Sequence, residues 1–138
     1  MRIYGDKRSG NCYKIQLLLS LLGKSCEWVD VDIMKGETRA PSFLEKTPNG
    51  KIPLLELDDG RVLSESNAIM HYIACNSPYV PSSPYHFSQL LQWQFLSVTL
   101  NFNDKNSNTS FFNGILYRFS DRSIDLNMKL LLVILLGL

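Results

Sequence analysis

The sequence predicts an α/β protein whose residues 1–76 form one domain. Three observations predict this class. Strand-like and helix-like runs alternate up to residue 75, and Asp58-Asp59-Gly60 separates two short apolar runs, which is a strong β-hairpin signal. Residues 77–84 carry three of the six prolines and are expected to form a linker. The expected order is β-α-β-α-β-β-α, with parallel strands first and then an antiparallel hairpin closed by a helix.

The first half of this domain is expected to contain two strands around one helix. Residues 2–4 and 27–31 are the strand candidates. The helix between them is indicated by apolar residues at i, i+3, i+4 and i+7, the spacing of an amphipathic helix. These residues are Ile15, Leu18, Leu19 and Leu22. Gly23 follows them and is expected to end the helix.

Four further elements are expected in the second half of the domain. Pro41 suits the first turn of a short helix. The hairpin supplies two strands, and either Ser64 or Ser66 is expected to cap a last helix. These elements span residues 41–46, 54–57, 62–63 and 65–74.

Beyond a linker at residues 77–84, the sequence predicts a helical segment over residues 85–138 with an atypical tail. The helical period is kept by four apolar residues, Phe87, Leu91, Phe95 and Val98. From about residue 101 an asparagine-rich polar run replaces this period. Residues 130–136 are apolar but too few to span a bilayer, which needs about 20 residues.

Charge and cysteine content argue against several classes of partner. The formal net charge of +1 disfavours a nucleic-acid or anionic-membrane partner. Cys12, Cys26 and Cys75 form no short-spaced pair, so neither a disulfide framework nor a metal site is expected. The N-terminus lacks the apolar core of a signal peptide. These features favour a protein of the reducing cytoplasm.

The first candidate site is residues 8–14, between the first strand and the first helix. A loop entering a helix offers free amide donors and the positive end of the helix dipole, so the Ser9 hydroxyl or the Cys12 thiol could stabilise an anion there. The alternative is that Ser9 or Asn11 only caps the helix. Cys12 also has two interpretations. Its thiolate is favoured at a helix N-terminus, whereas in the core it is a small apolar residue.

Two more candidate segments follow along the chain. Ile52-Pro53 stands directly before a strand, and a cis peptide bond there would leave the amide and carbonyl of Ile52 to pair with a ligand's backbone. In Glu65-Ser66, the serine and its adjacent amides could receive a carboxylate while the glutamate receives an amine. Taken alone, each motif is also explained as a turn or a helix cap.

The order and spacing of these three segments resemble the N-terminal domain of the glutathione transferases. The resemblance covers residues 1–74 and continues more weakly to about residue 96. It implies a thioredoxin-like fold and glutathione as co-substrate, with no metal. The glutathione-binding residues that it implies are Ser9, Asn11, Lys51, Ile52, Pro53, Glu65 and Ser66.

The resemblance also implies a role for most of these residues. Pro53 would be the cis proline, and the Ile52 backbone would pair with the cysteinyl part of glutathione. Glu65 and Ser66 would hold the γ-glutamyl end. Ser9 would be the hydroxyl that activates the thiol for addition to a small electrophile, in a chain that forms a homodimer as the family does.

Ser9 is sufficient for this activation in energetic terms. A thiol with a pKa of about 8.5 is only about 3% thiolate at pH 7. Lowering that pKa by about two units requires about 2.7 kcal/mol. A hydroxyl hydrogen bond to the anion supplies about 1.5–3 kcal/mol, and a helix N-terminus adds about 0.3–1 kcal/mol. The alternatives are a thiol–disulfide oxidoreductase that uses Cys12, and a glutathione-binding remnant without catalysis.

The resemblance fails beyond about residue 101. Members of the family continue there through helices that form the electrophile pocket and much of the dimer contact, whereas this chain has its asparagine-rich run and apolar tail. We therefore expect a truncated or frameshifted helical part. The glutathione site would survive, because it lies on residues 1–76. No identifiable segment would select a second substrate, so the sequence leaves enzyme activity open.

Overall fold

Four short strands form one mixed sheet in the computed structural model, which describes residues 1–103 and, from residue 96, the backbone alone. The strands are β1 (Arg2–Gly5), β2 (Glu27–Asp30), β3 (Leu54–Glu56) and β4 (Val62–Ser64), in the order β2-β1-β3-β4. β1 is parallel to β2 and antiparallel to β3, and β3 is antiparallel to β4. The expected parallel pair followed by an antiparallel hairpin is confirmed.

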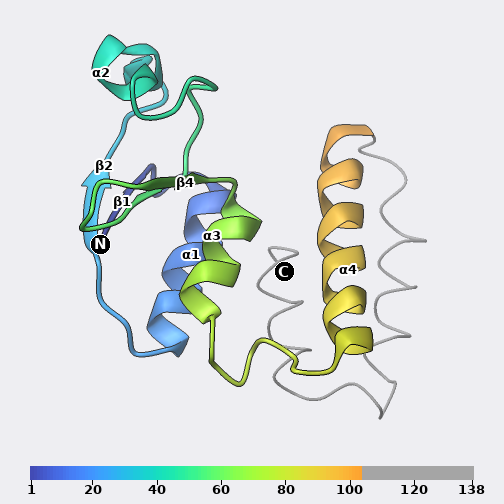
Figure 1. The fold of residues 1–138 in the computed structure, drawn as a ribbon. Helices are drawn as coiled ribbons and strands as arrows, with labels where there is room; N and C mark the ends of the chain where they lie inside the picture. The colour runs from blue at the N-terminus through green and yellow to red at the C-terminus, as the bar shows by residue number, and fades with distance from the viewer. Residues whose placement is uncertain (104–138) are drawn as a thin grey trace. The chain divides into compact units, whose positions relative to one another are not determined.

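Helices flank this sheet in the expected order. They are α1 (Gly10–Leu21), the 3₁₀ helix η1 (Glu37–Arg39), α2 (Pro41–Leu44) and α3 (Ser66–Ala74). α1 and α3 lie side by side (Figure 1). Gly23 has a φ of +60° and follows the last turn of α1, so the predicted stop is confirmed. The 3₁₀ helix η1 was not expected from the sequence.

The residues of β1 point alternately to the two faces of the sheet. On one face the Tyr4 ring packs edge-on against Phe43 of α2, with centroids 6.2 Å apart. On the other face a Cβ atom at Gly5 would lie 3.0 Å from Cys12 Sγ in α1. β1 therefore runs between α2 and α1. The buried core includes Ile3, Ile15, Leu18, Leu54, Leu55 and Ile69.

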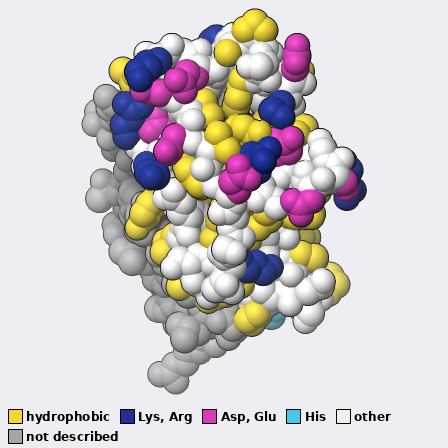
Figure 2. Space-filling view, turned by 90° about the vertical axis from the view of Figure 1, so that its left-hand side faces the viewer, with side chains coloured by type: hydrophobic (Ala, Val, Ile, Leu, Met, Phe, Trp, Pro, Cys, Tyr) yellow, Lys and Arg dark blue, Asp and Glu magenta, His cyan; other side chains and the backbone are white. Residues whose placement is uncertain are grey.

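Many surface charges on this part of the chain form ion pairs. Figure 2 shows Lys and Arg side chains interspersed with Asp and Glu side chains on one face, rather than gathered by sign. Exposed ion pairs include Arg2–Glu27 at 2.9 Å and Arg61–Asp59 at 2.7 Å. Exposed pairs of this type add little stability each.

The chain divides into two compact units, the first being Met1–Cys75. The second begins at Asn76 and contains α4 (Pro84–Asn103), in which Leu90 is fully buried. No helix within the described residues is long and apolar enough to cross a membrane. The tail expected from about residue 101 lies outside the described residues, except that residues 101–103 continue α4.

Candidate functional site

The sheet topology brings the three candidate segments to one end of the sheet. Tyr4 lies opposite Leu54 in the β1–β3 pair, so the end of β1 adjoins the start of β3. Leu54 lies opposite Ser64 in the β3–β4 pair, so the end of β4 lies there too. The loop after β1, the segment before β3 and the start of α3 therefore share this end. A direct contact joins two of the segments, because the Ser66 hydroxyl donates to Asn11 Oδ1 at 3.2 Å.

Ser9 is the N-cap residue of α1, but its hydroxyl makes no capping hydrogen bond. Its carbonyl accepts from the amides of Cys12 and Tyr13, at 3.0 and 2.9 Å. Its side chain instead acts on the neighbouring Cys12 thiol, whose pKa it lowers. Ser9 thus begins the helix through its backbone, and the interpretation that it is only a side-chain cap is not supported.

An ion-pair cluster holds the Ser9 loop. The buried carboxylate of Asp6 accepts from the Arg8 guanidinium at 2.6 Å, and the same guanidinium reaches Asp32 Oδ1 at 2.7 Å. The Ser9 amide donates to the Asp6 carbonyl at 2.9 Å. Hydrogen bonding from Arg8 holds the pKa of Asp6 well below its ordinary value, so this carboxylate stays charged at neutral pH. Asp6 was not singled out from the sequence, although its main partner, Arg8, lies only two residues along the chain. Asp32 joins this cluster only in the fold.

Cys12 lies in the core of the first unit. Its side chain is fully buried and faces the Cα of Gly5. Burial raises the pKa of the thiol, and the hydrogen bond from Ser9 only partly offsets this effect. The expectation that a position near the helix N-terminus favours the thiolate is therefore opposed by desolvation, which disfavours the charged form. The interpretation of Cys12 as a small apolar core residue fits this geometry better.

The start of α3 presents Glu65 and Ser66. Glu65 is exposed and occupies the N-cap position with a φ of +69°, which costs about 1–3 kcal/mol for a residue with a side chain. Neither Ser64 nor Ser66 is the cap, contrary to the prediction, since Ser66 is the first residue of the helix. The Ser66 side chain is buried and hydrogen-bonds to Asn11. A costly backbone conformation beside a buried hydroxyl is typical of a functional segment.

The segment before β3 is arranged as the resemblance implied. The Ile52–Pro53 peptide bond is cis, and Pro53 is buried. Ile52 precedes the β1–β3 ladder, whose register starts at the Tyr4–Leu54 pair. Lys51 has an exposed side chain, and its amide donates to Asn49 Oδ1 at 3.2 Å. Lys51 therefore lies shortly before the start of β3, and this hydrogen bond is made by its backbone rather than its side chain.

A second cross-helix contact was not foreseen from the sequence. The Lys14 side chain is only 6% exposed, and its ammonium donates to Asn67 Oδ1 at 2.8 Å. Burial lowers the pKa of Lys14 to about 8, while the charge of Glu65 opposes this shift. A signal was present, because Lys14 lies four residues before Leu18 and so extends the apolar face of the helix.

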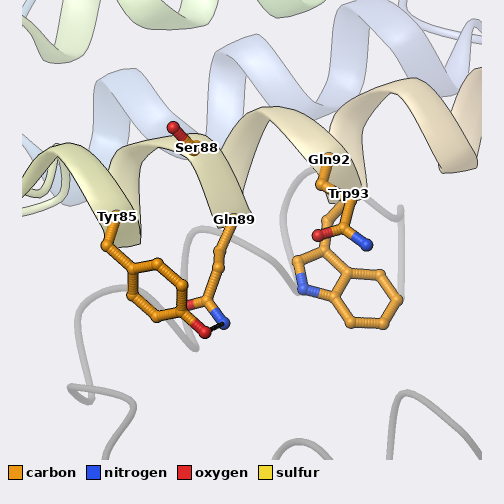
Figure 3. Close-up of a pocket in the computed structure, with 5 residues that line it drawn as sticks. All are labelled: Tyr85, Ser88, Gln89, Gln92 and Trp93. Carbon is orange, nitrogen blue, oxygen red and sulfur yellow. Dashed lines mark hydrogen bonds between the residues drawn. The ribbon is translucent and has the colours of Figure 1, made fainter.

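A surface pocket lies along α4 in the second unit. Figure 3 shows the five residues that line it, with a hydrogen bond of 3.3 Å from Gln89 Nε2 to the Tyr85 hydroxyl. The pocket residues are Tyr85, Ser88, Gln89, Gln92 and Trp93.

No group of three or more metal-binding side chains occurs among the residues described.

The mixed sheet, its flanking helices and the cis proline define the first unit as a thioredoxin-like domain. A model of the glutathione S-transferase N-terminal domain matches residues 3–84, more than half of the chain. The chain therefore belongs to the glutathione S-transferase family.

Individual relatives agree with this assignment. The maleylacetoacetate isomerase of Pseudomonas aeruginosa is 33% identical over 75 residues, which are 53% of this chain and 35% of that protein. A zeta class glutathione S-transferase of Euphorbia esula is 34% identical over 84 residues, which are 61% of this chain and 37% of that protein. A solved glutathione S-transferase from Pseudomonas fluorescens is 56% identical with a TM-score of 0.68, covering 70% of this chain and 48% of the other. The chain thus spans about a third of the length of these two curated relatives.

Proposed function

We propose that the chain binds glutathione on Met1–Cys75 and activates its thiol for addition to an electrophilic small molecule. The observation that carries the proposal is the hydrogen bond between Asn11 and Ser66, which joins the first turns of α1 and α3 at one end of the sheet. Family membership supports glutathione as the ligand. The proposed ligand residues are Ser9, Asn11, Lys51, Ile52, Pro53, Glu65 and Ser66.

Each segment has a part in the proposed binding mode. The first-turn amides of α3, with the Ser66 hydroxyl, receive the γ-glutamyl carboxylate, because a helix N-terminus favours an anion. The exposed Glu65 receives the neighbouring amine. The amide and carbonyl of Ile52 pair with the cysteinyl backbone of the tripeptide. This arrangement directs the glutathione thiol toward the start of α1.

Ser9 activates the thiol in this proposal. Its hydroxyl donates a hydrogen bond to the thiolate, which stabilises the anion by about 1.5–3 kcal/mol. The thiol proton passes to solvent, the sulfur forms a bond to the electrophilic carbon, and the leaving group departs with its electron pair when the reaction is a substitution. Ser9 is the N-cap residue of α1 and therefore stands at the helix entrance.

A thiol–disulfide reaction through Cys12 is the second candidate. Its support is the position of Cys12 in the first turn of α1, where a thiolate is favoured. Full burial of the side chain and the raised pKa of the thiol count against it. A mixed disulfide with glutathione would require the sulfur to become accessible. We therefore rank Ser9 above Cys12 as the catalytic residue.

The relatives named above include an isomerase and a transferase, so their names do not agree on one reaction. The family is therefore a better guide than either name. The electrophile and the oligomeric state are selected by parts of the family fold outside this match. The cytoplasm is our working proposal for location. A homodimer would rest on the family resemblance alone, and the expected truncation of the helices that make much of the dimer contact argues against it.

Calorimetric titration of the full chain with reduced glutathione tests the binding proposal. We expect a micromolar-to-millimolar dissociation constant that Ser66→Ala raises about tenfold or more, the effect of losing one hydrogen bond to a charged group. Ser42→Ala, which removes an exposed serine of α2, is the matched control and should bind as the wild type does. A folded chain that does not bind glutathione would refute the proposal.

Activity assays on single variants separate the two catalytic candidates. Ser9→Ala should lower the rate of glutathione conjugation to chlorodinitrobenzene, while Cys12→Ala should leave it largely intact. If Cys12→Ala instead abolishes reduction of a glutathione mixed disulfide and Ser9→Ala does not, the second candidate is correct. Binding without turnover in either assay would favour a non-catalytic glutathione-binding protein.

A further inference from the structure

Lys14 is a buried cation whose hydrogen-bond partner is neutral. Its side chain is 6% exposed, and its ammonium donates to the amide oxygen of Asn67 at 2.8 Å. No ion pair found within residues 1–103 involves Lys14. Burying an ammonium without a counter-charge is costly, because a dipole replaces only part of its hydration. A cation kept in this position needs an explanation.

The position of Asn67 connects this cation to the proposed glutathione site. Asn67 follows Ser66 in the first turn of α3, and Ser66 is itself bonded to Asn11. Two parallel contacts, Asn11–Ser66 and Lys14–Asn67, thus run from α1 to the start of α3. The ammonium is thus bonded to a residue of the turn whose amides would hold the ligand's carboxylate.

The charges around the first turn of α3 favour the binding of an anion there. Glu65 is the acidic group that interacts electrostatically with Lys14, but its side chain is exposed, so water and salt screen it. In the proposed binding mode Glu65 also pairs with the ligand's amine. Lys14 then retains a net positive potential, and the γ-glutamyl carboxylate is the group that can balance it.

We propose that Lys14 is a positioning residue that gives the start of α3 its selectivity for a carboxylate. This inference rests on the proposed function, since it concerns the same ligand. Lys14 acts in two ways: it orients Asn67 beside Ser66, and its buried charge adds to the positive end of the α3 dipole. A buried charge acts more strongly on a neighbouring charge through the protein interior than it would through water.

The test compares two ligands that differ only in that carboxylate. The probes are reduced glutathione and γ-aminobutyryl-cysteinylglycine, which keeps the amine and lacks the carboxylate. Their dissociation constants are measured by calorimetry on the full-length wild type, Lys14→Met, Lys14→Gln and Lys14→Arg. Lys24→Met is the matched control, because Lys24 bonds to the Ile73 carbonyl at the opposite end of α3. Thermal unfolding verifies that each variant is folded.

We expect Lys14→Met to weaken glutathione binding about tenfold and the binding of the analogue less than twofold, the loss expected when one charge interaction is removed. Lys14→Gln keeps a donor for Asn67 but no charge, so it should behave as Lys14→Met does. Lys14→Arg should restore most of the selectivity, and Lys24→Met should bind as the wild type. A merely structural tie between the helices would predict equal losses for both ligands and rescue by glutamine.

The outcomes separate this inference from the proposed function. If the wild type binds glutathione but Lys14→Met weakens both ligands equally or neither, the role of Lys14 is refuted and the proposed function stands. If the folded wild type binds neither ligand, both proposals fall. Loss of glutathione selectivity in Lys14→Met and Lys14→Gln alone, with the Lys24→Met control unchanged, supports the inference.

Discussion

Replacing Lys14 by methionine should change how the stability of the protein depends on pH. The pKa of Lys14 is lowered from 10.5 to about 8, burial being the largest cause. Between these two values the unfolded chain holds this proton and the folded chain releases it. By linkage, the free energy of unfolding of the wild type then rises with pH through this window. Methionine has no proton to release, so the variant lacks this rise.

The magnitude follows from the shift in pKa. One pKa unit corresponds to about 1.4 kcal/mol, so the shift as a whole is worth about 3 kcal/mol. At neutral pH the folded wild type carries the cost of the buried charge in full, and the variant is free of it. Between pH 7 and pH 10 the difference in unfolding free energy should therefore move by about 2–3 kcal/mol in favour of the wild type. Other ionisable groups are common to both proteins and cancel.

Urea denaturation at intervals of pH from 7 to 10 measures this difference. Comparing two proteins at each pH removes the contributions of the thiols and the other lysines. Lys24→Met, which replaces an exposed lysine, is the matched control. A Lys14→Met difference that is flat across the whole range would show that Lys14 is not desolvated in the folded state. It would also remove the physical basis for its role in carboxylate selectivity.

Three further predictions concern stability. Gly5→Ala should destabilise the protein by about 1–3 kcal/mol, measured by urea denaturation, because the new Cβ would lie 2.7 Å from Trp28 Cζ2; an unchanged midpoint would contradict it. Leu18→Ala should cost about 2–5 kcal/mol through the cavity left by a fully buried side chain, whereas the exposed control Leu21→Ala should cost far less. Asp6→Asn should destabilise the protein above about pH 4, because the pKa of Asp6 is lowered in the folded state. The stability that this contributes is lost as the pH falls through the folded-state pKa. Thermal midpoints of wild type and variant that differ equally at pH 7 and pH 3 would contradict this.

The elements of the first unit were predictable because their signals are local. The apolar period around Leu18 specifies α1, and Asp58-Asp59-Gly60 specifies the hairpin between β3 and β4. Pro41 indeed occupies the first turn of α2. The 3₁₀ helix at Glu37–Arg39 had no such signal, since three residues are too few to show a period.

The state of Cys12 could not be predicted in the same way, because it is decided by a residue seven positions away. Its sequence position, in the first turn of a helix, favours a thiolate. In the fold its sulfur occupies the space left by the missing side chain of Gly5, which removes it from water. Long-range packing therefore opposes a local electrostatic preference. Only the strand β1, by placing Gly5 against α1, reveals which effect dominates.

The site itself lies between these two cases. Spacing along the chain selected Ser9, Ile52 and Ser66, but each alone was equally explained as a cap or a turn. The strand pairing makes them neighbours, because an antiparallel β3 returns its start to the end of β1. Lys14 illustrates the remaining gap. A lysine on the apolar face of a helix is a detectable anomaly in sequence, yet its meaning depends on Asn67, which comes within 2.8 Å only when α3 packs against α1.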